Sequence, residues 1–126
     1  METMLKDDDV KVRIAAADAT ARTLGTFWNV VNTKNIRTLI NILLVKHISD
    51  SSSALVRVSA INAITMILEN PDSHGLLRSV MPFMKNMIHD NTERVRLAMV
   101  KLLLKVKTIR GLKFYEIVSQ EYLHAR

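Results

Sequence analysis

Three short segments of similar sequence, about forty residues apart, constrain the fold of this chain more than any other feature. They are residues 9–16 (DVKVRIAA), 53–60 (SALVRVSA) and 92–99 (TERVRLAM). Their shared valines stand at positions 12, 56 and 95, so the period is 44 and then 39 residues. A repeat of roughly 40–47 residues with helical patterns on both sides is typical of an α-solenoid, in which helix pairs stack on one another. A plain helical bundle is the alternative, and the common register of the three segments disfavours it.

The composition agrees with an all-α fold. The chain has 126 residues, of which 48% are hydrophobic, so it can build the core of about one domain. It contains only three glycines and two prolines, which favours long helices over sheets and turns. It has no cysteine, and this excludes disulfides and cysteine-ligated metal sites. The absence of cysteine also fits a reducing compartment.

Apolar periodicity and capping residues predict the individual helices. We expect helices over residues 10–31, 34–48, 54–69, 73–89 and 93–108. Pro82 should bend the fourth of these, because proline removes one backbone hydrogen bond. Gly111 should follow the end of the fifth, and residues 113–123 should start another repeat.

The predicted helices divide the chain into repeats. We predict one solenoid fragment over residues 1–126, with a partial repeat 1–31, full repeats 32–69 and 70–108, and a partial repeat 109–126. Because both ends fall inside a repeat, we expect the chain to be a piece of a longer protein. The polar, acidic start carries no secretory signal, and no apolar run approaches the ~18 residues of a membrane span.

Several apolar side chains invite a functional interpretation, but a structural one comes first. Phe27 and Trp28 should close the core at the end of their helix, with an exposed binding aromatic as the alternative. The methionines of residues 81–99 fit an adaptable core or the lining of a groove. Four histidines lie far apart in sequence and are expected in turns or on the surface: His47, His74, His89 and His124. We therefore predict no enzyme, no metal, no cofactor and no small-molecule substrate.

Acidic and basic residues recur at fixed places in the repeats. An acid in each turn precedes an arginine in the first turn of the following helix. The pairs are Asp7 and Arg13, Asp50 and Arg57, and Asp90 and Arg96. The spacing is six residues in the outer pairs and seven in the middle one, where Ser51 occupies the six-residue position.

This spacing, with Pro82 in the first helix of its pair, resembles the HEAT repeat. In that family the turn aspartate and the helix arginine of adjacent repeats form a hydrogen-bonded ladder along the solenoid. The resemblance implies structural rather than catalytic roles for Asp7, Arg13, Arg57, Asp90 and Arg96. The departure at Ser51 leaves the middle rung of the ladder open.

An ordered set of segments narrows the resemblance. They are residues 6–13 (KDDDVKVR), 26–28 (TFW), 73–77 (SHGLL), 89–96 (HDNTERVR), 102–107 (LLLKVK) and 113–118 (KFYEIV). In this order they resemble the chromosome-condensation HEAT subunits, and in particular the G-type subunit family of the condensin II complex. The resemblance covers essentially the whole chain. It implies a nuclear, chromosome-associated protein that binds the kleisin subunit, contacts double-stranded DNA and serves mitotic chromosome condensation.

Positive charge is the feature that could carry binding. The net charge is +6, and residues 71–126 hold ten of the eighteen lysines and arginines against five acids. Aligning the repeats on their valines places three sets in register: Lys11, Asp18 and Arg22; Leu55, Asn62 and Met66; Arg94, Lys101 and Lys105. Members of a set are seven and four residues apart, so they share a helix face. The third set is wholly basic, and Lys107, Arg110 and Lys113 follow it.

Two functions remain open from these patterns. The first is a non-enzymatic scaffold of a condensin-like complex, whose basic stripe follows a phosphate backbone in a salt-sensitive, sequence-independent way. The second is an adaptor of the nuclear-import or phosphatase-scaffold kind, in the nucleus or the cytosol, which binds proteins or acidic peptides without DNA. An ordinary solvated face explains the same lysines without any partner.

Overall fold

The computed structural model describes residues 2–47, 50 and 53–109, and within them the chain is all-helical, as predicted. The α-helices are α1 (Glu2–Leu5), α2 (Val10–Phe27), α3 (Thr33–Ile42), α4 (Ala54–Ile67), α5 (His74–Val80) and α6 (Glu93–Thr108). A π-helix η1 (Leu43–His47) continues α3, and the 3-10 helices η2 (Pro71–Ser73) and η3 (Met81–His89) precede and follow α5. The predicted residues Arg110, Gly111, Lys113 and His124, and the predicted helix 113–123, lie outside the described residues.

Polar residues in the turns set the helix starts. The side chains of Asp9, Asn32 and Ser53 accept hydrogen bonds from backbone amides in the first turns of α2, α3 and α4. Such caps satisfy amides that have no partner inside the helix. The predicted starts at residues 10 and 54, and both ends of the helix 93–108, are confirmed. Helix α3 begins at Thr33 with Asn32 as its cap, one residue before the predicted start at 34.

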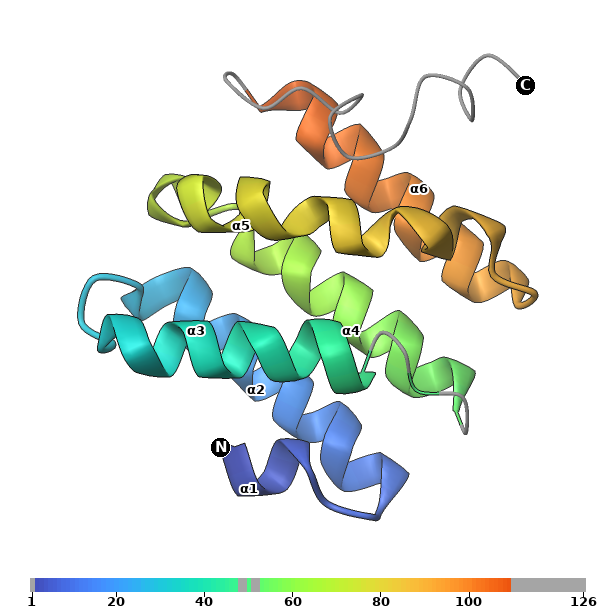
Figure 1. The fold of residues 1–126 in the computed structure, drawn as a ribbon, viewed down its shortest axis with the longest axis horizontal. Helices are drawn as coiled ribbons and strands as arrows, with labels where there is room; N and C mark the ends of the chain where they lie inside the picture. The colour runs from blue at the N-terminus through green and yellow to red at the C-terminus, as the bar shows by residue number, and fades with distance from the viewer. Residues whose placement is uncertain (1, 48–49, 51–52, 110–126) are drawn as a thin grey trace.

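The helices form two layers (Figure 1). Helices α2, α4 and α6 lie side by side in one layer, and α3 and α5 with η3 cross in front of them. Helix α4 is central, because it packs against α2 on one side and α6 on the other. The short α1 packs against α2 and α3. Residues about forty positions apart therefore become neighbours in space.

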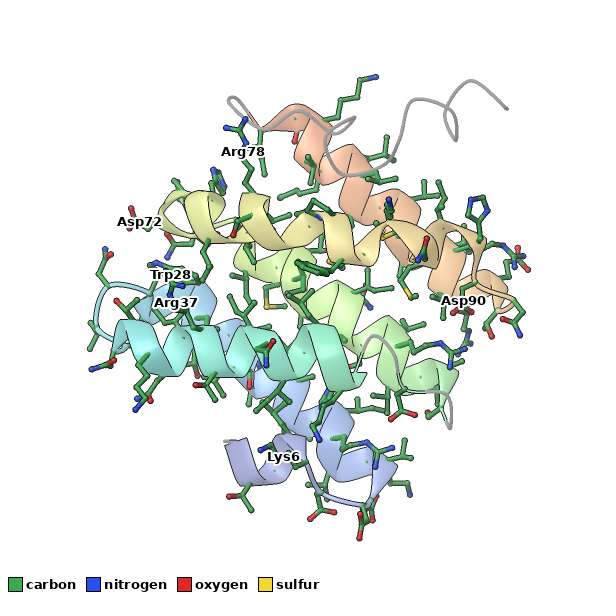
Figure 2. All side chains as sticks on the ribbon, viewed as in Figure 1. Lys6, Trp28, Arg37, Asp72, Arg78 and Asp90 are labelled. Carbon is green, nitrogen blue, oxygen red and sulfur yellow. The ribbon has the colours of Figure 1, made fainter. Side chains whose placement is uncertain are left out.

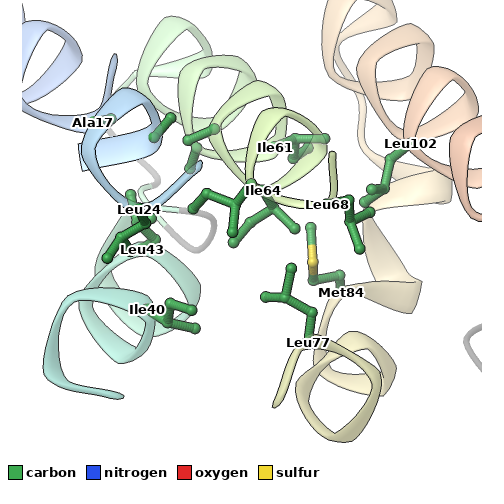
Figure 3. Close-up of a cluster of buried hydrophobic side chains, with 14 of the residues drawn as sticks. Ala17, Leu24, Ile40, Leu43, Ile61, Ile64, Leu68, Leu77, Met84 and Leu102 are labelled. Carbon is green, nitrogen blue, oxygen red and sulfur yellow. The ribbon is translucent and has the colours of Figure 1, made fainter. Parts of the chain in front are cut away.

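The core lies between the two layers (Figure 3). Ile61, Ile64 and Leu68 meet side chains from the other helices there, and all three are essentially inaccessible to solvent. The side chains around them are Leu24, Ile40, Leu43, Leu77, Met84 and Leu102. The methionines serve this core, since Met81, Met84 and Met99 are fully buried. Flexible thioethers fill irregular spaces between crossing helices.

Two predicted helices differ in their internal geometry. The predicted helix 34–48 is α-helical only to Ile42 and then widens into the π-helix η1. The predicted helix 73–89 changes at Met81, next to Pro82, into the 3-10 helix η3. Proline has no amide hydrogen and clashes with the preceding turn, which favours a change of hydrogen-bond pattern at this point.

The end of α2 corrects a further prediction. The helix ends at Phe27, four residues before the predicted boundary, and a turn follows in which the amides of Val30 and Val31 bond to the Phe27 carbonyl. The Phe27 side chain is 54% exposed, so it does not close the core. Trp28 is half-buried and packs against the core. Apolar character alone does not tell which of two adjacent aromatics faces inward.

Candidate interaction surface

Arginines at the starts of α2, α4 and α6 connect successive turns at one end of the molecule. Arg13 donates from Nη1 to the carbonyl oxygens of Asp7 and Asp8, at 2.9 Å each. Its Nη2 donates to Oδ2 of Asp50, in the next turn along the stack, at 3.1 Å. The two side chains are only 14% and 12% exposed. This contact joins segments 37 residues apart in sequence.

Arg57 repeats the arrangement one turn further on. Its Nη1 donates to the Asp50 carbonyl at 2.6 Å, and its Nε donates to Oδ2 of Asp90 at 3.0 Å. Asp90, labelled in Figure 2, lies at this end of the molecule. Arg96 in turn donates from Nη1 to the Asp90 carbonyl at 2.7 Å. Each arginine thus holds the carbonyl of its own turn, and Arg13 and Arg57 also hold the carboxylate of the next turn.

The middle rung, left open by Ser51, is made by Asp50. Its carboxylate pairs with Arg13 and also accepts the backbone amide of Ser53 at 3.1 Å. The carboxylate of Asp7 has a different role, because it accepts the Asp9 amide while only the Asp7 carbonyl meets Arg13. In the sequence, Asp50 could be recognised by its position in the turn before the helix, even though it lies seven rather than six residues before Arg57.

His47 lies beside this network and corrects the prediction of a turn or surface histidine. The side chain is 1% exposed, and its Nε2 lies 2.6 Å from the carbonyl oxygen of Leu5 in α1. Among the described residues, none forms a hydrogen bond with Nδ1. Burial lowers the pKa of His47, and the hydrogen bond to Leu5 partly opposes that shift. The neutral ring with its proton on Nε2 therefore fits this position.

The layer of α2, α4 and α6 also presents an open face. A groove of about 510 Å³ runs between α2 and α4, and its lining residues all belong to these two helices. Most of them are apolar, with Ile14 and Ala15 on α2 and Leu55, Val58 and Met66 on α4. On α6, Leu97, Val100 and Leu104 are also exposed. The face therefore combines apolar side chains with the predicted basic residues.

The predicted basic residues are divided by the structure. Lys11, Arg94, Lys101 and Lys107 are exposed, and none of them forms an ion pair within the part of the chain that the structure describes. Arg22 pairs with Asp18 on the surface of α2. Together with Lys105, these residues make six predicted positions, which do not form one unbroken stripe.

Two features break the stripe. Nζ of Lys105 donates to Oε1 of Glu69 at 3.2 Å. Helix α4 presents Leu55, Asn62 and Met66 between the cations of α2 and those of α6. Lys107 stands two residues from Lys105 and so does not share its helix face. The free positive charge of this layer is therefore concentrated on α6 and at the start of α2.

Two other kinds of function, metal binding and membrane insertion, can be compared with the described residues. Within residues 2–47, 50 and 53–109, no group of three or more histidine, aspartate or glutamate side chains is placed to hold a metal ion. Among the described helices, none is long and apolar enough to cross a membrane.

The described residues thus define an all-helical protein with two layers, an arginine–aspartate network at one end and an open face of mixed apolar and basic character. Comparison with known proteins finds relatives named condensin-2 complex subunit G2. The zebrafish (Danio rerio) protein is 36% identical over 123 residues, the Xenopus laevis protein 33% over 123, and the human protein 32% over 124.

Each of these alignments covers 98% of the chain, which in turn spans about 11% of the length of each relative. The chain therefore resembles the G-type subunit of condensin II along nearly its whole length, as the ordered sequence segments predicted. No family model matches the chain, and no solved structure matches it.

Proposed function

We propose that the chain is a stretch of a non-enzymatic scaffold subunit of a condensin II-type complex, acting in the nucleus on mitotic chromosomes. The observation that carries the proposal is the resemblance to the condensin-2 G2 subunits over 98% of the chain. Such a scaffold binds its partners through the surface of its helices and requires no catalytic groups. The exposed face of α2, α4 and α6 is the surface that we assign to partners.

The same proposal includes a HEAT-type solenoid. Its repeats would be α3 and η1 with α4, over residues 32–69, and α5 and η3 with α6, over residues 70–108, flanked by the partial repeats 1–31 and 109–126. The arginine–aspartate contacts Arg13–Asp50 and Arg57–Asp90 support it, because each joins one helix pair to the next. A stack in which each unit contacts only its neighbours suits an extended scaffold.

Within the complex we propose two contacts, one with the kleisin subunit and one with double-stranded DNA. Arg94 and Lys101 support the DNA contact, since both are exposed, lie on one face of α6 and lack an acidic partner among the described residues. Lys107 would add to it from the same helix, and Lys11 from the start of α2, on the far side of α4. Such contacts neutralise phosphates and release counterions, so they weaken as salt rises.

A duplex-binding experiment tests the DNA contact. Binding of a random-sequence duplex is measured at two salt concentrations for the native chain and for the double variant Arg94→Glu/Lys101→Glu. The matched control is Lys34→Glu/Arg37→Glu, which changes the net charge equally but lies on exposed positions of α3 in the other layer. We expect the α6 variant to bind about tenfold more weakly or worse, and the control much less so. Equal losses in the two variants would remove α6 as the DNA-binding surface.

The kleisin contact has a separate test. The chain is co-expressed with a condensin II kleisin subunit, and the two are purified through a tag on the kleisin. Retention of the chain supports the scaffold proposal, whereas its loss, with the chain still helical by circular dichroism, contradicts the kleisin contact in this stretch.

A second candidate function is an adaptor that binds protein segments and no DNA. The exposed apolar side chains Leu55, Leu97, Val100 and Leu104 favour it, because a phosphate backbone gains nothing from them while a protein partner does. Binding to a protein segment with no salt-sensitive duplex binding would favour this function over the first.

A further inference from the structure

The groove between α2 and α4 has a shape that follows from small side chains. Ala15, Ser59 and Ala63 occupy positions where larger residues would fill the space between the helices. Ser59 Oγ lies 3.5 Å from the Ile14 carbonyl oxygen, so the two helices approach each other closely at the groove. The hollow of about 510 Å³ is therefore built into the packing of α2 against α4, which is the most extensive contact between the helices that the structure describes.

Apolar side chains mark the two ends of the groove. Leu55 is 51% exposed and Met66 is 38% exposed, and both line it. Ile14 and Val58, which are half-buried, lie between them. Leu55 and Met66 are eleven positions apart on α4, a length of roughly 16 Å at 1.5 Å per residue. Three turns of a partner helix match that length.

The charges of the groove are unequal. Asp18 is neutralised by Arg22, one turn further along α2. Lys11, at the end of the groove near Leu55, has no acidic partner among residues 2–47, 50 and 53–109. The first turns of α2 and α4 lie at this end, and helix N-termini attract negative charge. The groove is thus mainly apolar, with a positive charge at one end that is unpaired among the described residues.

We propose that this groove docks an amphipathic helical segment of a partner protein, with apolar side chains along the groove and a carboxylate against Lys11. The inference deepens the protein-binding part of the proposed function and rests on it. A nucleic-acid strand fits the groove poorly, because the lining is mainly apolar and includes Asp18. Helices that lay an apolar face into a groove are a recurrent mode of recognition.

The test uses a pair of designed peptides. One is a labelled helical peptide of about 15 residues, long enough to cover the groove, with leucines along one face and glutamates flanking them. Its twin carries lysine in place of every glutamate. We expect the 126-residue chain to bind the acidic peptide with a dissociation constant below about 1 mM and at least about tenfold more tightly than the basic twin.

Variants locate the binding. Leu55→Glu and Met66→Glu alter exposed side chains inside the groove and should each weaken binding of the acidic peptide about tenfold. The matched control is Phe83→Glu, an exposed apolar residue of η3 in the other layer, which should leave binding unchanged. Lys11→Glu should reduce or invert the preference between the two peptides. Circular dichroism checks that each variant keeps its helicity.

Several outcomes would overturn the proposal. Failure of both peptides to bind, equal affinity for the two, or an equal loss in Phe83→Glu and Leu55→Glu would each do so. A chain that dimerises, and becomes monomeric only in Leu55→Glu, would show that the groove pairs with a second copy instead.

The DNA and groove proposals fail separately. Arg94→Glu/Lys101→Glu tests duplex binding on α6, whereas Leu55→Glu and Met66→Glu test peptide binding between α2 and α4. Peptide binding that persists while duplex binding is absent would keep the groove and reject the DNA contact. Duplex and kleisin binding without any peptide binding would reject the groove alone.

Discussion

Two sets of ion pairs in this molecule have the same chemistry and different surroundings. At the turn end, Arg13–Asp50 and Arg57–Asp90 have side chains that are at most 14% exposed, and each arginine also holds backbone carbonyls. On the open face, the Arg22 and Asp18 side chains are 68% and 49% exposed, and Lys105–Glu69 is similarly accessible. The first set joins distant turns, whereas Arg22–Asp18 joins neighbours on one helix.

The difference shows where charge serves stability and where it is available to partners. Removing one member of a nearly buried pair leaves the other without solvent or counter-charge, which is costly. In an exposed pair, each charge exchanges contacts with water for contacts with its partner, so the pair adds little to the free energy of unfolding. We therefore expect the turn end to hold the stack together, while the open face can change its charges without loss of fold.

The largest effect is expected from Arg57→Ala. The substitution removes the bonds to both carboxylate oxygens of Asp90 and to the Asp50 carbonyl. Because Asp90 is only 8% exposed, its charge would be left almost buried, and we expect a loss of about 3 kcal/mol in the free energy of unfolding. Urea denaturation followed by circular dichroism measures it. A loss no larger than that for Arg22→Ala would erase the contrast between the two sets.

Asp50→Ala should have the next largest effect. It removes the partner of Arg13 and the acceptor for the Ser53 amide, at the turn before α4. We expect about 2 kcal/mol, since Arg13 keeps its bonds to the Asp7 and Asp8 carbonyls. A double-mutant cycle with Arg13→Ala should show coupling between the two sites, and strictly additive losses would contradict a direct pair.

His47→Gln should change how stability depends on pH. Burial lowers the pKa of folded His47, so below about pH 6.5 the unfolded chain takes up a proton that the folded chain resists. The native chain should therefore lose stability as the pH falls from neutral through this range. Glutamine can still donate to the Leu5 carbonyl but does not titrate, and its variant should lose less.

Thermal or urea unfolding of the native chain and of His47→Gln, compared at neutral and mildly acidic pH, measures this difference. Parallel curves would show that His47 is protonated alike in both states. Other acidic groups contribute to both curves, so only the difference between them reports on the histidine.

The smallest effect is expected from Lys105→Ala. The Glu69 side chain that it contacts is 65% exposed, and such pairs contribute at most about 0.5 kcal/mol. The same stability measurement applies, repeated at high salt, where the difference should shrink further. A loss as large as that of Asp50→Ala would mean that the open face also holds the fold.

Much of the fold could be predicted from local signals. The capping residues and the three- and four-residue apolar steps placed α6 at both ends and α4 at its start. Apolar residues at such steps on α4 are buried: Val56, Ala60, Ala63, Ile64 and Ile67. The change to π-helix after Ile42 was not predicted, and at Met81 only a bend at Pro82 was predicted. The choice among α, π and 3-10 geometry depends on how the neighbouring helices pack.

The candidate site was less accessible to sequence reasoning. Spacing placed Arg94, Lys101 and Lys105 on one face of α6, but it could not show that Glu69 engages Lys105. The groove between α2 and α4 was also missed, although two of the small residues that line it, Ala15 and Ala21, are visible in the sequence. A groove forms only when two helices pack at a particular angle and register, and the sequence of one helix does not specify either of these.

The sequence by itself determined an all-helical chain, the register of its Val–Arg segments and the burial of most apolar faces, because these depend on residues three to seven positions apart. Only the tertiary structure decided that Asp50 pairs with Arg13, that His47 is enclosed beside Leu5 and that α4 separates the cations of α2 from those of α6. Each of these depends on contacts between segments tens of residues apart. The packing of the two layers determines such contacts, and this packing cannot be read from local periodicity.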